Sequence, residues 1–432
     1  MDNKPIKVAF VSLGCPKNLI DTEVMISILN KNGFEIVADD FEADVIVINT
    51  CAFIEEAKKE AIENILDIAW LKENKDLKGI VVAGCLAERY REEILSELPE
   101  ADALIGTGSI EDICNAVNSA YKGSKGLAKY CSFRDASESP LGGERVVTTP
   151  EHFAYLKIAE GCDNHCTYCI IPKLRGKFRS RQMNDIVEEA RDLASLGAKE
   201  ICLIAQDTTR YGTDLFGVSA LDTLIHEISK IKRIEWIRTL YCYPERITDG
   251  LIDEIAKNPK ALKYFDIPIQ HISDHVLKLM NRAGDSASIR SVINRIRKRI
   301  PNAVLRTTVM VGFPGETEED FNELLEFVKE GNFQRLGAFE YSREEGTPSF
   351  DFENQVDEKT KQRRRELIMQ EQQKIHVAFN ESLVGKTLKV ICEGFDAVSE
   401  TYYGRSEMDA YDVDGKIFFS SGMKIPEGKF VN

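Results

Sequence analysis

Three strand-like runs in the first hundred residues each lead directly into a cysteine. The runs are rich in β-branched and apolar residues, and the segments after the first two carry apolar residues at helical spacing. Strands that alternate with helices predict a parallel sheet with helices on both faces, the doubly wound α/β arrangement. The runs and their cysteines are 8–14 with Cys15, 45–50 with Cys51, and 79–84 with Cys85.

These three cysteines share one position in the predicted topology. In a doubly wound sheet, ligands bind beyond the carboxyl ends of the strands, so Cys15, Cys51 and Cys85 are expected on the binding edge. A single cysteine there is explained well enough as an inert buried thiol, because free cysteine is among the most buried residue types. Packing gives no reason to choose cysteine at three strand ends, so we interpret them as the three protein ligands of a cluster site.

A second strand–helix series begins after a segment of different composition. Residues 122–150 contain Gly-, Ser- and Pro-containing stretches without periodicity, and they are predicted to be a linker that lets the flanking domains reorient. Six candidate strands follow, with helical stretches such as 183–196 and 318–331 between them. Six such units predict an open (βα)6 partial barrel, smaller than the closed TIM barrel, with its site at the carboxyl ends of the strands. The candidate strands are 153–158, 200–205, 236–241, 264–269, 304–311 and 336–341.

The last part of the chain changes pattern again. Residues 356–380 are predicted to form a polar helix, whose Lys and Arg side chains we interpret as a solvated face in preference to an RNA-binding surface. Residues 383–391 and 415–419 are strand-like and are separated by glycine-containing turns, which predicts a small all-β barrel. The expected architecture is therefore α/β with a small β domain at the C-terminus.

Three more cysteines, Cys162, Cys166 and Cys169, follow the first strand of the second series. Three thiolates can hold three irons of a cubane cluster and leave the fourth iron without a protein ligand. Structural zinc would need a fourth ligand, for which His165 is the nearest candidate. An electron-transfer cluster of the ferredoxin type normally has two-residue spacings and a fourth cysteine, whereas the first spacing here is three residues.

Charge and hydropathy indicate which class of partner and which cellular compartment to expect. The chain has 56 Lys or Arg against 71 Asp or Glu, and its formal charge of −15 favours a basic protein over nucleic acid as the main partner. The first residues lack the layout of a signal peptide, and no apolar run approaches the roughly 18 residues of a membrane helix. We expect a cytoplasmic protein without membrane association, whose eleven cysteines are metal ligands and buried thiols rather than disulfides.

The order Cys-x-x-x-Cys-x-Tyr-Cys at residues 162–169 resembles the signature of the radical S-adenosylmethionine superfamily. The resemblance implies a 4Fe-4S cluster on these three cysteines, with S-adenosylmethionine on the free iron as the source of a 5′-deoxyadenosyl radical. It also implies an electron donor for the cluster. Tyr168 matches the aromatic position that lies against the adenine, although packing alone explains an aromatic residue there equally well.

Nearly the whole chain resembles the methylthiotransferase family of that superfamily. The resemblance implies an auxiliary-cluster domain at residues 1–121, the linker at 122–150, a radical core at 151–378 and an OB-like TRAM domain at 379–432. It further implies a second 4Fe-4S cluster on the three N-terminal cysteines, with a sulfide on its open iron, and a second S-adenosylmethionine as methyl donor. Family members usually continue through a last strand, so the TRAM barrel is expected to be incomplete.

Four motifs resemble the branch of the family that modifies the β-carbon of an aspartate in ribosomal protein uS12. The tRNA-modifying relatives carry Gly-Cys-Gln-Met-Asn where this chain has residues 14–18, and Gln-Ser-Gly-Ser where it has residues 270–273. From residue 370 to the end there are ten Asp or Glu and seven Lys or Arg, which suits a basic protein better than tRNA. The implied partner is thus a basic ribosomal protein, docked through the TRAM domain. A tRNA methylthiotransferase is the alternative within the family, and a zinc- or RNA-binding protein is the non-enzymatic alternative. The motifs are residues 12–18, 49–54, 269–273 and 341–347.

A glycine-rich turn at residues 312–317 follows the fifth strand of the second series. Its Glu316, together with Arg306 on the strand itself, is a candidate polar contact for S-adenosylmethionine, although such a turn is explained equally well as structural. Five cysteines join no group of candidate ligands and are assigned to inert buried thiols. They are Cys114, Cys131, Cys202, Cys242 and Cys392.

Overall fold

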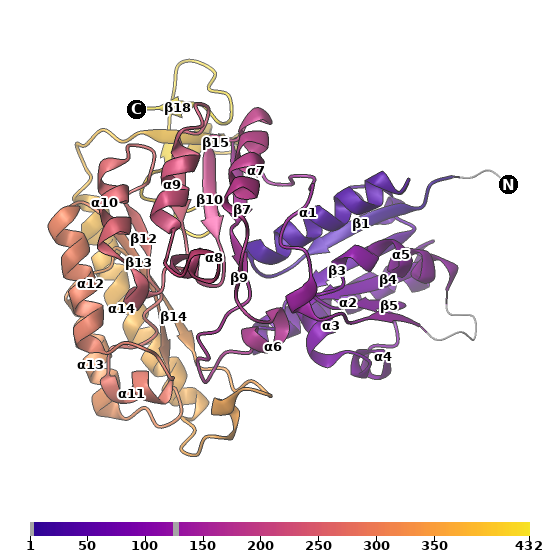
Figure 1. Ribbon diagram of the computed structural model, residues 1–432, viewed down its shortest axis with the longest axis horizontal. Coiled ribbons are helices and arrows are strands. Elements are labelled where there is room, and N and C mark those ends of the chain that lie inside the picture. The colour runs from indigo at the N-terminus through magenta and orange to yellow at the C-terminus, as the bar shows by residue number, and fades with distance from the viewer. Residues whose placement is uncertain (1–3, 124–128) are drawn as a thin grey trace.

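A computed structural model of the protein describes residues 4–123 and 129–432, and in it the chain forms three regions in sequence order (Figure 1). The first region is a parallel sheet with the strand order β2-β1-β3-β4-β5-β6. Its strands are β1 Lys7–Ser12, β2 Glu35–Ile36, β3 Val45–Thr50, β4 Gly79–Gly84, β5 Ala103–Ile105 and β6 Tyr130–Ser132. Its helices are α1 Pro16–Lys31, α2 Glu55–Asn74, α3 Cys85–Tyr90, α4 Glu93–Glu97 and α5 Ile113–Lys122.

Both faces of this sheet are covered. Successive residues of a strand point to opposite faces, and β3 is apolar on both. Val45 and Val47 pack in one core with α1 and α5, whereas Ile46 and Ile48 pack in another with α2 and α3. This arrangement confirms the doubly wound parallel sheet that the sequence predicts.

The segment between the first two regions is part of the structure and not a free spacer. Strand β6 lies inside the range 122–150 and extends the first sheet by pairing parallel with β5. Farther along, Arg145 forms ion pairs with Glu23 of α1 and with Glu189 of α7 (Met183–Ser195). The composition of this segment predicted that it lets the domains reorient. Composition cannot reveal the ion pairs between distant residues that tie the segment to α1 and α7. Residues 124–128 of this range lie outside the described part of the chain.

The second region confirms the open partial barrel. Its parallel strands form two sheets, β11-β10-β7 and β12-β13-β14, and a bridge between Ile237 and Ala261 joins them. The strands are β7 Phe153–Lys157, β10 Glu200–Ile204, β11 Trp236–Thr239, β12 Tyr264–Asp266, β13 Val304–Val311 and β14 Arg335–Glu340. The other helices of this region are α6 Ile171–Arg175, α8 Thr213–Phe216, α9 Leu221–Ser229, α10 Asp249–Lys257, α11 Asp274–Leu279, α12 Ser286–Arg299 and α13 Glu318–Lys329.

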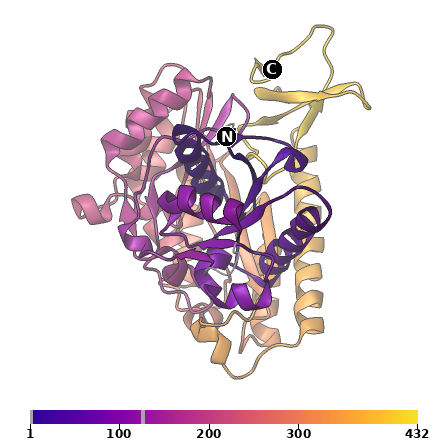
Figure 2. The ribbon, with the colours of Figure 1, turned by 90° about the vertical axis from the view of Figure 1, so that its right-hand side faces the viewer.

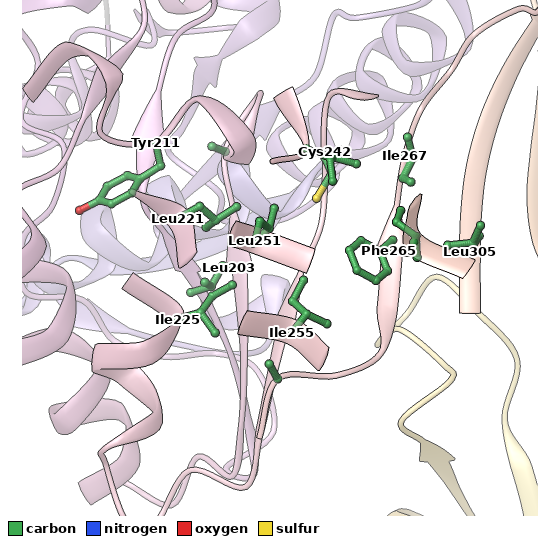
Figure 3. Packing of buried hydrophobic residues seen from close by; sticks show 14 of the residues in the cluster. Leu203, Tyr211, Leu221, Ile225, Cys242, Leu251, Ile255, Phe265, Ile267 and Leu305 are labelled. Atoms are coloured by element: carbon green, nitrogen blue, oxygen red, sulfur yellow. The ribbon is translucent and has the colours of Figure 1, made fainter. Parts of the chain in front are cut away.

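A large apolar core lies between the barrel strands and these helices. Figure 3 shows Leu203 of β10 and Phe265 of β12 among the apolar side chains of α9 and α10. Cys242 lies in the same cluster, and burial raises the pKa of its thiol. Its position agrees with the assignment of Cys242 as an inert buried thiol.

The third region begins with a long helix, α14 Glu358–Glu381, which leads into the C-terminal strands at one end of the molecule (Figure 2). The strands pair antiparallel in the order β17-β16-β15-β18 and form a half-barrel. The predicted strand at 383–391 begins only at Val390, because α14 continues to Glu381 and residues 383–386 form a turn. The short β18 pairs with the start of β15. The strands are β15 Val390–Asp396, β16 Thr401–Ser406, β17 Ile417–Phe419 and β18 Phe430–Val431.

Buried ion pairs hold the half-barrel against the amino-terminal halves of the barrel strands. Glu200 of β10 accepts hydrogen bonds from Arg238 of β11, at 2.7 Å, and from Arg405 of β16, at 2.8 Å. Arg335 of β14 pairs with Asp409 at 2.7 Å. The C-terminal region therefore covers the end of the barrel opposite the carboxyl ends of its strands. No helix in the described part of the chain is both long and apolar enough to cross a membrane.

Candidate functional site

Neighbouring strands of the first sheet place Cys15, Cys51 and Cys85 at one edge. Strand β3 pairs with β1 on one side and with β4 on the other, so their carboxyl ends lie together. Cys15 caps the amino end of α1, Cys51 follows β3, and Cys85 begins α3 directly after β4. The backbone of Gly14 has φ +87°, and a Cβ at Gly14 would lie 2.6 Å from the Cβ of Cys51. Glycine is therefore required where the first loop passes the second cysteine.

Two asparagines fix the loops that carry these cysteines. The Asn18 side chain donates to the carbonyls of Leu13, at 3.1 Å, and Thr50, at 2.9 Å. The Asn49 side chain donates to the carbonyl of Asn18 at 2.8 Å. Both side chains are buried, so these bonds hold the first and second cysteine loops in one arrangement. Both asparagines lie within the motifs used in the sequence comparison, where they had no assigned role.

The second cysteine group lies in a loop at the carboxyl end of β7. The backbone N–H of Cys162 donates to the Gly176 carbonyl at 3.1 Å, and that of Cys169 donates to the Cys166 carbonyl at 3.0 Å. Thr167 ties the loop to the end of α11 by two further bonds, from its N–H to the Met280 carbonyl and from its hydroxyl to the Leu279 carbonyl. The loop therefore has a fixed shape, and it occupies the edge where a partial barrel carries its site.

The thiols of both groups lie in environments that disfavour a free thiolate. Burial raises the pKa of Cys85 to about 12 and that of Cys162 to about 11, and it raises the pKa of Cys169 further. A coordinating metal deprotonates such a thiol outright and compensates the charge. Both groups thus have the donor chemistry of an iron–sulfur cluster.

A guanidinium lies beside each group, buried in the case of Arg175 and half-buried in the case of Arg282. Arg175 donates to the sulfur of Cys85 at 3.7 Å, and Arg282 donates to the sulfur of Cys166 at 3.9 Å. The Nε of Arg282 is buried without a hydrogen-bond partner. Cations at these positions would offset the negative charge of thiolate ligands. Sequence reasoning did not single out either arginine, although Arg175 lies only six residues after Cys169.

A zinc ion and a cubane cluster require different arrangements of their cysteine ligands. In the described residues, no three His, Cys, Asp or Glu side chains are arranged to hold a single metal ion. A tetrahedral zinc with Zn–S bonds of about 2.3 Å needs its sulfurs roughly 3.8 Å apart. A cubane spreads its cysteine ligands over separate irons, so it does not need this close approach.

Arg175 also joins the two regions. It pairs with Asp21 of α1 at 2.5 Å and with Glu160 at 3.3 Å, and Lys157 of β7 contacts the same two carboxylates at 2.8 and 2.9 Å. All four side chains are buried. Burial opposes ionisation of Glu160, but Lys157 and Arg175 together hold its pKa well below its usual range. This four-residue network, Asp21, Lys157, Glu160 and Arg175, lies between Cys85 and the loop that begins at Cys162.

A second contact places the cysteine edge of the sheet over the mouth of the barrel. The Lys17 ammonium, two residues after Cys15, lies 3.7 Å from the centre of the Tyr241 ring, just after β11. Burial opposes a charge on Lys17, yet Tyr241 and Cys15 raise its pKa, so the side chain stays cationic. The carboxyl ends of both parallel sheets therefore face each other.

The structure places Tyr168 next to the glycine-rich turn at 312–317. Its ring meets Phe313 edge to face with 6.3 Å between the ring centres. The Glu316 side chain is engaged within the protein: it accepts from the N–H of Phe313 at 3.0 Å and pairs with Arg364 of α14 at 2.9 Å. Arg306 is held by Asp266 at 2.7 Å. Contacts of these three residues with S-adenosylmethionine remain predictions.

The ionisation of Glu316 is expected to make the free energy of unfolding depend on pH. Burial raises the pKa of Glu316 to about 7, above the value of about 4.3 expected in the unfolded chain. Between these values the folded state binds the extra proton, so the free energy of unfolding is expected to fall as pH rises from about 4.3 to about 7. Glu316→Gln should show a flatter profile in urea titrations across this range. Parallel profiles for the two proteins would contradict the assignment.

The other cysteines stay apart from both groups. Cys202 and Cys392 are buried, Cys114 and Cys131 are half-buried, and burial raises the pKa of all four. Their environments agree with the assignment as inert thiols.

Comparison with known proteins places each region in a family. Residues 7–106 match the uncharacterized protein family UPF0004, residues 156–328 match the Radical SAM superfamily, and residues 384–432 match the TRAM domain. Among solved structures, the radical S-adenosylmethionine methyltransferase TsrM from Kitasatospora setae superposes with a TM-score of 0.60 at 13% identity, over 80% of this chain and 77% of that one. That similarity concerns the fold alone.

Much closer similarity is found among curated sequences. A protein of Acetivibrio thermocellus named ribosomal protein uS12 methylthiotransferase RimO is 49% identical over 99% of this chain and 95% of its own length. A protein of the same name from Caldanaerobacter subterraneus is 51% identical over 98% of this chain and 96% of its own. The chain therefore belongs to the RimO family of radical S-adenosylmethionine methylthiotransferases.

Proposed function

We propose that this protein is a transferase that places a methylthio group on the β-carbon of an aspartate in ribosomal protein uS12. The observation that carries the proposal is the pair of three-cysteine groups at facing strand ends, with Arg175 between them. This arrangement would let one substrate carbon meet both groups in turn. The proposed compartment is the cytoplasm, where ribosomal proteins are found.

Each cysteine group would hold one 4Fe-4S cluster. Cys162, Cys166 and Cys169 would leave one iron free for S-adenosylmethionine, and Cys15, Cys51 and Cys85 would leave one free for sulfide. When bound, the first cluster and S-adenosylmethionine supply a radical able to remove hydrogen from an unactivated carbon, and the second cluster and another S-adenosylmethionine supply the methylated sulfur. An electron donor of unspecified kind would reduce the first cluster.

The side chains of this protein place positive charge beside the cysteines and fix the relative position of the two groups. Loading the clusters must release the protons of thiols whose pKa values burial has raised, so loading is favoured by rising pH. Arg175 and Arg282 provide positive charge beside one thiol of each group. The network of Asp21, Lys157, Glu160 and Arg175 fixes the first region over the barrel mouth, which sets the relative position of the two groups.

The TRAM domain is proposed to help dock the substrate protein. Its strands β15 and β17 expose the aromatic side chains of Phe395 and Phe418. Beside them, Tyr402 of β16 stacks on Phe419 with 5.6 Å between ring centres. Its excess of carboxylates suits the positive charge of ribosomal proteins.

The test is anaerobic reconstitution with iron and sulfide, followed by incubation with S-adenosylmethionine, a reductant and either purified uS12 or tRNA. We expect uS12 to gain one methylthio group on an aspartate and tRNA to remain unchanged by mass spectrometry. Modification of tRNA alone would replace the proposal with tRNA methylthiolation. A colourless protein that contains zinc and no iron or sulfide would contradict both.

A further inference from the structure

A groove of about 620 Å³ lies on the outer side of the contact between the first region and the barrel. One wall comes from α2, α3 and α4 of the first region. The other comes from the loop after β14, through Arg343, Glu345 and Phe350. This loop contains residues 341–347, one of the four motifs that resemble the uS12-modifying branch. The groove has the size of a ligand-binding site but not yet an assigned role.

The wall from the first region is apolar. It includes Ile62 of α2, Leu86 and Tyr90 of α3, and Ile94 of α4. The apolar surface continues along α2 beyond the groove, because Ile62, Leu66 and Trp70 follow one another at four-residue spacing and are 37%, 47% and 53% exposed. Exposed apolar side chains that adjoin a groove are typical of a protein-binding surface.

The rim of the groove is acidic. Glu93 and Glu97 of α4 are exposed and form no ion pair with a described residue, and Glu345 lies on the opposite wall. The nearby cation Lys58 is already paired with Glu55, at 2.7 Å, and with Glu344, at 3.0 Å. Arg343 on the loop wall is exposed and forms no ion pair with a described residue, so the lining holds four carboxylates against two cations. Residues 51–102, which form this side of the first region, contain thirteen Asp or Glu and seven Lys or Arg. The surface therefore attracts a cationic partner and repels a second copy of this chain.

The groove ends next to two of the N-terminal cysteines. Leu86 in its wall directly follows Cys85. Arg89 donates to the carbonyl of Ala52, the residue after Cys51, at 2.9 Å and pairs with Glu344 at 2.6 Å. A chain lying in the groove would thus contact Leu86, the residue next to Cys85.

We propose that this groove, lined by α2, α3, α4 and the loop 343–350, binds a basic segment of the substrate protein beside the aspartate that is modified. The inference rests on the proposed function and adds a second docking surface to the TRAM domain. Cationic side chains of the segment would meet Glu93, Glu97 and Glu345, and its apolar side chains would pack on Ile62 and Tyr90. A ribosomal protein provides such segments because its natural partner is a polyanion.

Charge reversal of the rim tests the proposal. We expect Glu93→Lys with Glu97→Lys to raise the Kd for purified uS12 about tenfold at low salt, with a smaller effect at high salt because the charges are screened. The matched control is Glu319→Lys with Glu323→Lys, a pair of exposed carboxylates at the same spacing at the start of α13. The control should change the Kd by less than about twofold. Fluorescence anisotropy with labelled uS12 measures both.

An apolar variant gives an independent measurement. We expect Ile62→Ser to raise the Kd for uS12 about threefold, because it removes an apolar contact without opening the core. Leu196→Ser, at an exposed position after α7, should leave the Kd unchanged. All variants should cleave S-adenosylmethionine without substrate at the wild-type rate, which shows that they are folded and loaded.

Failure of the groove proposal and failure of the proposed function give different results. If the wild type modifies uS12 but the rim pair and its control change the Kd equally, or neither changes it, the groove is not the docking surface. If the wild type neither binds nor modifies uS12, the proposed function fails. Tighter binding of tRNA by the rim variant, together with tRNA modification by the wild type, would overturn both.

Discussion

Replacing Arg175 with leucine is expected to lower the free energy of unfolding by about 3 to 5 kcal/mol, the range for removing one member of a buried ion network. The change leaves Asp21 and Glu160 buried, with Lys157 as the remaining cation that contacts both, and removes the donor beside Cys85. Equilibrium denaturation under anaerobic conditions measures the loss. Activity on uS12 should fall with it, because the network fixes the first region over the barrel mouth.

The matched control is Arg295→Leu. Arg295 pairs with Asp249 at 2.7 Å on the surface, where water and salt screen the interaction. We expect a much smaller loss of stability and unchanged activity. If Arg175→Leu is no more destabilising than this control, the buried network does not hold the two regions together.

The reduction potential of the auxiliary cluster is a measurement that does not depend on folding stability. It should shift to lower values in Arg175→Lys, since a hydrogen bond to a ligand sulfur favours the reduced form.

Replacing Cys51 with alanine is expected to abolish methylthiolation of uS12 while S-adenosylmethionine cleavage continues. Cys51 is proposed to ligate only the auxiliary cluster, and the Cys162 loop does not depend on it. The iron content should fall from roughly eight to roughly four per chain. Product analysis for 5′-deoxyadenosine and mass spectrometry of uS12 separate the two activities.

Cys131→Ala is the control for this experiment. Cys131 lies in β6 of the same sheet and joins neither cysteine group. It should retain both clusters and both activities. Loss of S-adenosylmethionine cleavage in Cys51→Ala would show that Cys51 does not serve a separate auxiliary site.

Most of the fold could be predicted from local sequence patterns. The alternation of β-branched strands with helices depends on short-range periodicity, so the positions of β3, β4 and α2 were predictable within a few residues. The placement of Cys15, Cys51 and Cys85 at one edge followed from strand order alone. The start of β15 was missed because an apolar run after α14 forms a turn and not the predicted strand.

The contacts between regions could not be predicted in the same way. Asp21 and Arg175 are 154 residues apart in sequence, and nothing in the local pattern of either indicates the other. The buried position of Glu316 was missed for the same reason, because its partner Arg364 lies on α14, 48 residues later. A charged residue close to a ligand cysteine, as Glu160 and Arg175 are, is the signal that could have suggested a buried ion network.

The central claim is methylthio transfer to a protein aspartate by two clusters at facing strand ends. Its most direct test is the mass of uS12 after anaerobic incubation with the reconstituted protein, S-adenosylmethionine and reductant, beside Cys162→Ala and Cys51→Ala. We predict that the wild type adds one methylthio group to a single aspartate and that both variants add none. Unmodified uS12 with the fully loaded wild type, or modification by Cys51→Ala, would contradict the account.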